Sequence, residues 1–344
     1  MSRKKITLQD LSNELGLSVQ TISKALRGRP GMSEQTRSKV IKLARERGYL
    51  TREQEQSLGF DGISPYPVMQ RRFILLHNAL SLNFNKLLLQ GLRERFLEFG
   101  HTVQPLLLPS ELRPEQFDAW CEEQDLLYSD GIFIAPRLND DRLEEKLLQL
   151  PIPRILLNYP PPGAKADSVI WDVYEAVYQA VRHLIAFGHR NIMYAGDAIS
   201  QRGFVLRWQA FRDAMAEAGL DADPEQHSVS RDANGQWIRE FKQLYRRTNP
   251  TALLCAIDEE VGPLLSALQE MNVSVPHQCS VVACLNEQSD KLPLCSRPLL
   301  LIKETGYRAA DRMLWRIANP TLPFEHVRIR GDFFIGNTTF RINL

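Results

Sequence analysis

The sequence lacks the features that would place it in a membrane or an oxidising compartment. No stretch approaches the roughly 18 uninterrupted apolar residues of a membrane span, and the opening MSRKKITLQD has no apolar signal-peptide core. Five cysteines without a CxxC pair suggest neither a disulfide framework nor a zinc site, and buried free thiols are favoured over a redox switch. We therefore expect a cytoplasmic protein with no membrane partner, metal or cofactor.

Catalytic motifs are also missing. There is no GxSxG or HExxH, the stretches GDAISQRG and GFDGIS are not phosphate loops, and the seven histidines have no metal-ligand spacing. His183 and His189 flank the end of an apolar helix, so packing or capping is favoured over catalysis for both. An enzyme is the least supported class. With 344 residues and 44% hydrophobic content, the chain can form two or three cooperative units.

Charge is unevenly distributed along the chain. Residues 1–52 carry twelve Lys or Arg against four Asp or Glu, a net charge of +8, whereas the whole chain carries only +1. The other 292 residues therefore sum to −7. This asymmetry favours a head that binds a polyanion on a neutral-to-acidic body, because Lys and Arg neutralise nucleic-acid phosphates. A merely solvated basic surface is the alternative.

The first fifty residues predict three short helices. Thr7 with Asp10 is typical of an N-cap, and Gly16 ends that helix. Ser18 begins a second helix, SVQTISKALRG, after a tight turn. Ser33 begins a third helix, SEQTRSKVIKLARERG, which Gly48 ends. This is the helix-turn-helix plan, in which the second helix enters the major groove of DNA.

Base readout is expected from the start of the second helix. Gln20 can pair with an adenine edge, Lys24 can donate to guanine and Val19 can touch a thymine methyl. Phosphate contacts suit Thr21, Ser23, Arg27, Arg29 and Thr36. The alternative is that these side chains are only the solvated face of a small helical bundle. The full set of predicted DNA contacts in the helices and their connections is Thr7, Ser18, Val19, Gln20, Thr21, Ser23, Lys24, Arg27, Arg29 and Thr36.

The segment from Ile6 to Leu50 resembles, over its whole length, the DNA-binding head of the LacI family of bacterial transcription regulators. The resemblance places the base-reading residues at Val19, Gln20 and Lys24. It also implies a hinge helix after Tyr49 that inserts a leucine, here Leu58, into the minor groove. Glu53 and Glu55 depart from that pattern and should oppose docking, so this segment is either a weakened hinge or a flexible tether.

From Arg72 onward, apolar runs such as RFILLHNA, GIFIAP, NIMYAGD, TALLCAID and SVVACL alternate with amphipathic, helix-length stretches. Continuous apolar strands separated by helices predict parallel sheets covered on both faces, with ligands beyond the carboxyl ends of the strands. This body resembles the two-lobed, periplasmic-binding-protein-like core of the same family. The expected fold is a small all-α helix-turn-helix domain followed by a two-lobed α/β core with parallel sheets.

The resemblance implies three units: a head at 1–50, a hinge or linker at 51–71 and a core at 72–344. The first lobe is expected at about 72–170 and 298–325, and the second at about 171–297 and 326–344. Arg207 and Asp258 are expected to contact polar groups of a ligand, although an inter-lobe salt bridge is the alternative for Arg207. Phe84 is expected to stack on the ligand or to lie in the core. The other expected cleft residues are Asn78, Arg137, Asn158, Trp171, Asp172 and Trp237.

Two departures affect the expected ligand. Leu285 stands where many sugar-responsive members have a carboxylate, and Asn158 stands where some have an aspartate. The ligand is therefore a sugar, a sugar derivative or a related metabolite, and Arg137 with Arg207 would suit an anionic group. The resemblance implies a regulator, expected to be a repressor, that binds operator DNA as a homodimer or tetramer and associates with the nucleoid when bound. The alternative is a cytoplasmic solute sensor whose head has lost DNA binding.

Overall fold

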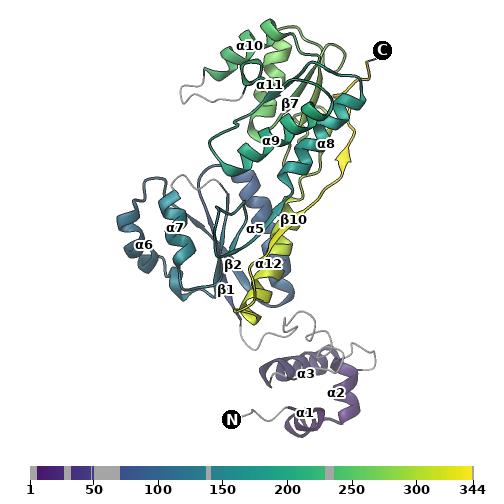
Figure 1. Cartoon of the computed structure of the whole chain (residues 1–344). Coiled ribbons are helices and arrows are strands. Elements are labelled where there is room, and N and C mark those ends of the chain that lie inside the picture. The colour runs from purple at the N-terminus through teal and green to yellow at the C-terminus, as the bar shows by residue number, and fades with distance from the viewer. Residues whose placement is uncertain are drawn as a thin grey trace.

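The computed structural model describes residues 6–26, 32–47, 49, 70–136, 141–228 and 236–342 (Figure 1). The first part holds three helices, α1 (Leu8–Leu15), α2 (Val19–Leu26) and α3 (Glu34–Arg47). The predicted caps are confirmed: Thr7 and Asp10 form a capping box, Ser18 Oγ accepts from the Thr21 amide at 3.1 Å, and α1 ends at Gly16 with φ 63°. The head core lies between the helices and consists of Leu11, Ile22, Ala25, Val40, Leu43 and Ala44.

The first lobe is built on a parallel sheet of six strands in the order β10-β5-β4-β3-β1-β2. Its strands are β1 (Arg72–His77), β2 (Thr102–Leu107), β3 (Gly131–Ile134), β4 (Arg154–Leu156), β5 (Asp167–Trp171) and β10 (His326–Ile329). Phe73 and Leu75 of β1 lie in one core cluster and Ile74 and Leu76 in another, so helices cover both faces. The predicted parallel α/β class is confirmed.

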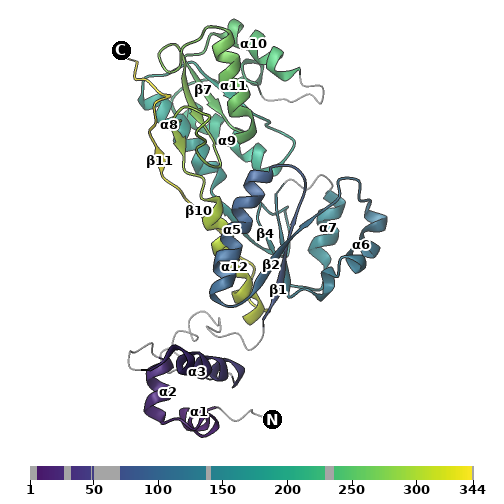
Figure 2. The same cartoon turned by 180° about the vertical axis from the view of Figure 1, so that it is seen from behind.

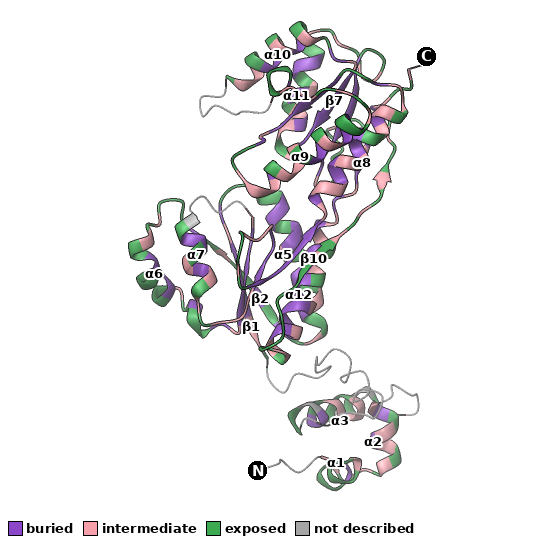
Figure 3. Ribbon diagram, in the orientation of Figure 1, coloured by how far each residue is buried: buried purple, intermediate pink, exposed green. Residues whose placement is uncertain are grey.

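Two pairs of helices cover this sheet. One face packs on α5 (Leu82–Glu98) and α12 (Ile302–Ala318), which lie side by side. The other packs on α6 (Phe117–Glu123) and α7 (Asp141–Gln149), near the short 3-10 turns η1 (Pro114–Gln116) and η2 (Leu126–Tyr128). Figure 3 shows the strands buried beneath helices whose outer sides are exposed.

Helices α5 and α12 approach so closely that two glycines are required. A Cβ on Gly91 would lie 1.9 Å from the Lys303 carbonyl oxygen, and one on Gly306 would lie 2.2 Å from that of Leu88. Helix α12 is also tied to the sheet, because the fully buried Asp167 accepts hydrogen bonds from Arg312 and Arg316. These contacts hold α12 firmly in the first lobe.

The second lobe has a parallel sheet of β6 (Ile192–Ala195), β7 (Ala252–Cys255) and β8 (Ser280–Ala283). Its helices are α8 (Val173–Ala186), α9 (Arg202–Glu217), α10 (Trp237–Thr248) and α11 (Asp258–Glu270), with the 3-10 turn η3 (Pro224–Gln226). The short strands β9 (Arg297–Pro298) and β11 (Phe333–Phe334) pair antiparallel beside it. His189 bonds to Thr251 and Ser280 and to the carbonyl of Phe340, so it packs the C-terminal segment onto this lobe.

The chain crosses between the lobes three times: from β5 to α8, from β9 to α12 and from β10 to β11. Figure 2 shows the last of these running along the molecule toward the C-terminus. Strand β10 pairs with β5 in the register His326 to Ser168, so residues 326–329 extend the first sheet. The expected boundary before His326 is therefore corrected to one after Ile329, because main-chain pairing carries the chain one strand further.

Candidate functional site

The exposed face of α2 carries the predicted base readers. Gln20 and Lys24 are exposed and one helical turn apart, while Ile22 and Ala25 of the same helix are buried in the head core. Val19 and Ser23 are partly exposed. The polar side chains of Gln20 and Lys24 thus lie on the solvent-exposed face of α2. Contact of these side chains with DNA stays a prediction.

Several of the predicted phosphate-contacting hydroxyls already serve the helix ends. Thr7 Oγ1 donates to Asp10 at 2.7 Å, the Ser18 and Thr21 hydroxyls lie 2.9 Å apart, and the Thr36 hydroxyl lies 2.8 Å from that of Ser33. These contacts fix the first turns of the helices. The predicted contacts Arg27, Arg29 and Leu58 lie outside the described residues.

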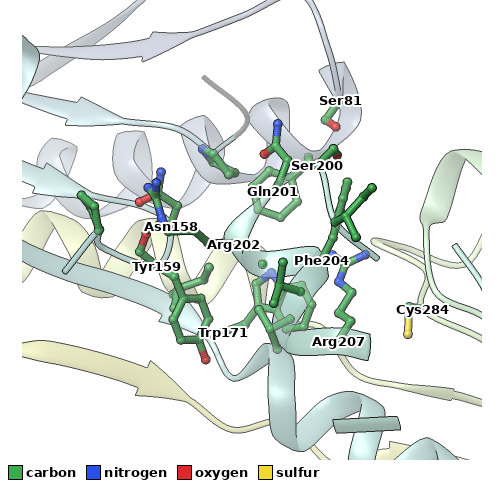
Figure 4. A pocket seen from close by; sticks show the side chains of 18 of the residues that line it. Ser81, Asn158, Tyr159, Trp171, Ser200, Gln201, Arg202, Phe204, Arg207 and Cys284 are labelled. Carbon is green, nitrogen blue, oxygen red and sulfur yellow. Dashed lines mark hydrogen bonds between the residues drawn. The ribbon is translucent and has the colours of Figure 1, made fainter. Parts of the chain in front are cut away.

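A cavity of about 520 Å³ lies between the lobes of the core (Figure 4). It is lined by five of the residues that the sequence singled out: Phe84, Asn158, Trp171, Arg207 and Asp258. Three of them follow from the sheet topology. Asn158 comes just after β4 and Trp171 ends β5 in the first sheet, whereas Asp258 follows β7 in the second sheet. In each sheet the carboxyl ends of the parallel strands are where ligands bind.

Arg207 is fixed by two aromatic rings and a carbonyl of its own lobe. Its guanidinium carbon lies 5.3 Å from the centre of the Trp171 ring and 5.1 Å from that of Phe204, and Nη1 donates to the Ala256 carbonyl. Such stacking orients a guanidinium and weakens its hydration. This hydrogen bond ties the Arg207 guanidinium to its own lobe, and its expected contact with a ligand stays a prediction.

Asp258 is held by a neighbour that the sequence interpretation missed. Its carboxylate accepts from the Asn286 amide at 2.7 Å and from Asn286 Nδ2 at 3.0 Å. Burial raises the pKa of Asp258, and these two hydrogen bonds oppose the rise. Asn286 follows β8, so its place beyond a strand end was the signal available in the sequence.

Four buried polar atoms of the cavity-lining residues have no hydrogen-bond partner within the described parts of the chain. They are Asn158 Oδ1, the Tyr159 hydroxyl oxygen, Trp171 Nε1 and Arg207 Nε. Asn158 and Trp171 are only 8% and 2% exposed. Leaving such an atom unpaired costs about 1–3 kcal/mol. One acceptor, two donors and one hydroxyl that can do either are therefore available to a polar ligand placed beside the rings of Trp171, Phe204 and Phe84.

Among the described residues, an ion pair joins the lobes across this cavity. Arg202 opens α9 in the second lobe, and its Nη2 lies 2.6 Å from Oε1 of the buried Glu144 on α7 of the first lobe. Arg202 Nε also donates to the Tyr159 carbonyl at 2.9 Å. We call these contacts the cleft bridge. The sequence did not indicate it, because neither residue follows a strand directly.

Three expected cleft residues do not line the cavity. The Asn78 side chain accepts from the Leu80 amide at 3.0 Å and so shapes the turn after β1. Asp172 is the N-cap of α8, with Oδ1 accepting from the Glu175 amide at 3.1 Å. Trp237 begins α10 and packs on the second-lobe core. Arg137 lies outside the described residues.

The cysteines of the chain lie in its interior. All five cysteines are free and buried, as expected. Cys284 lines the cavity, and burial raises the pKa of its thiol to about 11, so it is protonated at neutral pH. In the described ranges, no three His, Cys, Asp or Glu side chains are grouped as metal ligands. Within the same ranges, no helix has the length and apolar character of a membrane span.

Comparison with known proteins adds relatives for both parts of the chain. Residues 181–339 match a periplasmic binding protein-like domain. The HTH-type transcriptional regulator AglR of Rhizobium meliloti (strain 1021) is 28% identical over 328 residues, which is 91% of this chain and 88% of AglR.

Solved structures share the fold from end to end. The Lac repressor dimer bound to operator and the anti-inducer ONPF matches with a TM-score of 0.66 and 20% identity, covering 98% of this chain and 100% of that one. The complex of the transcriptional regulator CelR with cellobiose matches with a TM-score of 0.68 and 20% identity, covering 97% and 100%. The arrangement of a helical head before a two-lobed core is thus common to all three.

Proposed function

We propose that this chain is a member of the LacI family of bacterial transcription regulators and acts as a homodimer whose two heads read the half-sites of an operator. In each head, Gln20 and Lys24 contact base edges while basic side chains neutralise phosphates. The structural relative crystallised as a dimer on its operator supports this assembly. We propose that the protein acts as a repressor.

The effector is a small polar metabolite, and a sugar or sugar derivative fits best. The observation that carries this proposal is the set of unpaired buried atoms Asn158 Oδ1, Trp171 Nε1 and Arg207 Nε beside aromatic faces. Hydroxyl groups both donate and accept, so they can satisfy this mixed set, while the C–H face of a sugar ring packs on an aromatic ring. The relative bound to cellobiose supports the class.

Ligand binding would change operator affinity by favouring one relative position of the lobes. We expect the effector to touch both lobes, which in the described residues are joined by three crossings of the chain, by packing within one hydrophobic cluster and by the cleft bridge. A ligand that prefers one position shifts the population toward it and so changes the spacing of the two heads. The coupling free energy between the two sites is obtained from the ratio of the operator affinities measured with and without effector.

The ligand part is tested by a thermal-shift screen of the full chain over sugars, sugar phosphates, nucleosides and purines. An effector that binds only the folded protein raises its apparent stability by mass action. Each compound that does so is then added to an operator-binding assay. A stabilising compound that leaves operator affinity unchanged would contradict the regulatory role, and the absence of any stabilising compound would contradict the effector class.

The DNA part is tested by selecting binding sites from random duplexes and measuring affinity at several salt concentrations. A working head gives a pseudo-palindromic site and an affinity that falls steeply as salt rises, because phosphate contacts release counterions. Absence of both a selected sequence and a salt dependence would instead support the alternative of a solute sensor whose head has lost DNA binding.

A further inference from the structure

The first strand of the core is held at its amino-terminal end by side chains from two other segments. Strand β1 begins at Arg72, and the chain reaches the head through the residues before it. The Arg71 amide donates to Nδ1 of His101 at 3.2 Å, and the Arg72 amide donates to Oδ2 of Asp130 at 2.8 Å. Arg71 Nη1 donates to Oδ1 of the same carboxylate at 2.9 Å. We call these three hydrogen bonds the exit clamp.

The exit clamp ties the start of β1 to both of its neighbouring strands. His101 directly precedes β2, and Asp130 directly precedes β3. The main chain is paired at the same place, since the Thr102 amide donates to the Arg71 carbonyl at 3.0 Å and the Asp130 amide donates to the Arg72 carbonyl at 2.8 Å. The two arginines are therefore held from both sides, by side chains as well as by the backbone.

His101 and Asp130 contribute to the clamp in different ways. The His101 residue is only 5% exposed, and burial lowers its pKa to about 4, so at neutral pH the ring is uncharged and Nδ1 can accept a hydrogen bond. The ring packs among the aromatic side chains Phe73, Phe96 and Phe99. Asp130 instead forms an ion pair with Arg71, and the two side chains are 28% and 29% exposed.

Strand β1 connects the exit clamp to the cavity edge of the first lobe. Residues 73–76 are buried, and the strand is paired with β2 and β3 on its two sides. The turn that follows β1 carries Ser81, which lines the cavity. A central strand moves with its neighbours, because separating them would leave buried backbone groups without partners. A displacement of the first lobe therefore displaces Arg71 and Arg72 with it.

We propose that Asp130 and His101 are positioning residues for operator binding, because they fix the point at which each chain leaves the core and so set the spacing of half-sites that the two heads accept. This proposal rests on the proposed operator-binding homodimer and names the residues that pass the position of the first lobe to the heads. A duplex with a wrong spacing strains the complex, and an exit without its clamp yields to that strain. The preference for one spacing then weakens, while the contact of one head with one half-site is unchanged.

The test uses the full chain with four duplexes: the selected pseudo-palindrome, the same duplex with one central base pair inserted or removed, and a single half-site. One base pair moves a half-site by about 3.4 Å and turns it by about 36°. The wild type should bind the selected spacing most tightly. Asp130→Ala removes two of the three clamp bonds, so the ratio of dissociation constants for altered and selected spacings should fall by about two- to fivefold, the range for one partly exposed ion pair. Affinity for the single half-site should stay at the wild-type value.

A second variant and a control separate positioning from stability. His101→Phe removes the remaining clamp bond with a ring that suits the aromatic surroundings, and it should lower the spacing ratio in the same direction. Leu147→Ala is the control, because Leu147 of α7 is buried in the core cluster on the other face of the first sheet. It should destabilise the same lobe and leave the spacing ratio unchanged.

The outcomes distinguish this proposal from the proposed function. Unchanged ratios in both Asp130→Ala and His101→Phe, with the selected duplex still bound, overturn the positioning role and leave operator binding standing. A wild type that binds every spacing equally does the same. A ratio that falls as far in Leu147→Ala also overturns the positioning role, since lost stability would then explain the effect. If the wild type selects no duplex at all, the proposed function fails and the role of the exit clamp fails with it.

Discussion

Replacing Arg202 with Met should loosen the two lobes without unfolding either of them. Arg202 bonds to Glu144 and to the Tyr159 carbonyl across the cavity, and methionine keeps much of its length without its charge. The side chain of Glu144 is 6% exposed. Without the Arg202 guanidinium, the Glu144 carboxylate loses its compensating charge while the lobes are together, and it is hydrated again when they separate.

The expected size of the effect follows from burial. Removing one partner of a fully buried pair costs about 3–5 kcal/mol. Because the Arg202 side chain is 35% exposed and partly screened by water, we reduce this to about 1–3 kcal/mol. The balance between the joined and separated positions of the lobes should therefore shift by about 5- to 150-fold. If the ligand binds the joined position, its affinity should fall by at most this factor, in proportion to the lost fraction of joined molecules.

The assay combines small-angle X-ray scattering, which measures the radius of gyration, with calorimetric titration of an identified effector. The variant should have a larger radius without ligand and should recover the wild-type radius at saturation. Glu144→Gln combined with Arg202→Met forms a double-mutant cycle, and the loss in the double variant should be smaller than the sum of the single losses.

A matched control is Arg330→Met. Arg330 pairs with Glu175 at 2.8 Å, but its side chain is 70% exposed, and such surface pairs contribute about 0–1 kcal/mol. Identical scattering and ligand affinity in Arg202→Met and the wild type would refute the reasoning. Equal effects of Arg202→Met and Arg330→Met would also refute it, since they would show that any inter-element pair has the same influence.

Three further predictions concern the head, the cavity between the lobes and three histidines. Lys24→Ala should weaken operator binding by about 1–3 kcal/mol in a competition assay and random-duplex binding far less, and equal losses would contradict base readout. Arg207→Ala should weaken effector binding by about 1.5–3 kcal/mol in calorimetry and abolish the effector response in gel-shift titrations, while operator affinity without effector stays constant. Burial lowers the pKa of His101, His183 and His227 from 6.5 to about 4 in the folded chain. The unfolded chain therefore takes up protons first, and stability should fall as pH drops from about 6.5 toward 4; an unchanged urea midpoint between about pH 7 and pH 5 would contradict this.

The cavity residues could be predicted from the sequence where a strand positions them. Apolar runs such as TALLCAID locate the strand, and the next polar residue, Asp258, falls at the sheet edge where ligands bind. The same rule failed at Asp172. That aspartate precedes a helix directly, and its preference for an N-cap position decided its orientation. Local helix chemistry was therefore the stronger influence at this position.

The cleft bridge could not be predicted in this way. Glu144 stands in DDRLEEKLLQL, a pattern typical of a helix with a solvated acidic face. The residue as a whole, backbone included, is nevertheless only 4% exposed. Its burial arises from contact with α9 of the other lobe, and hydrophobic periodicity describes only how a helix packs on its own sheet. Trp237, expected in the cleft, lies on α10 against the second-lobe core for the related reason that an isolated aromatic does not reveal which element it faces.

The contact of Gly91 with α12 and of Gly306 with α5 limits how the core can respond to any signal. A larger residue at either position would force the two backbones apart, so we expect α5 and α12 to move together as one body. A change in the relative position of the lobes should then carry both helices along with the first-lobe strands on which they pack.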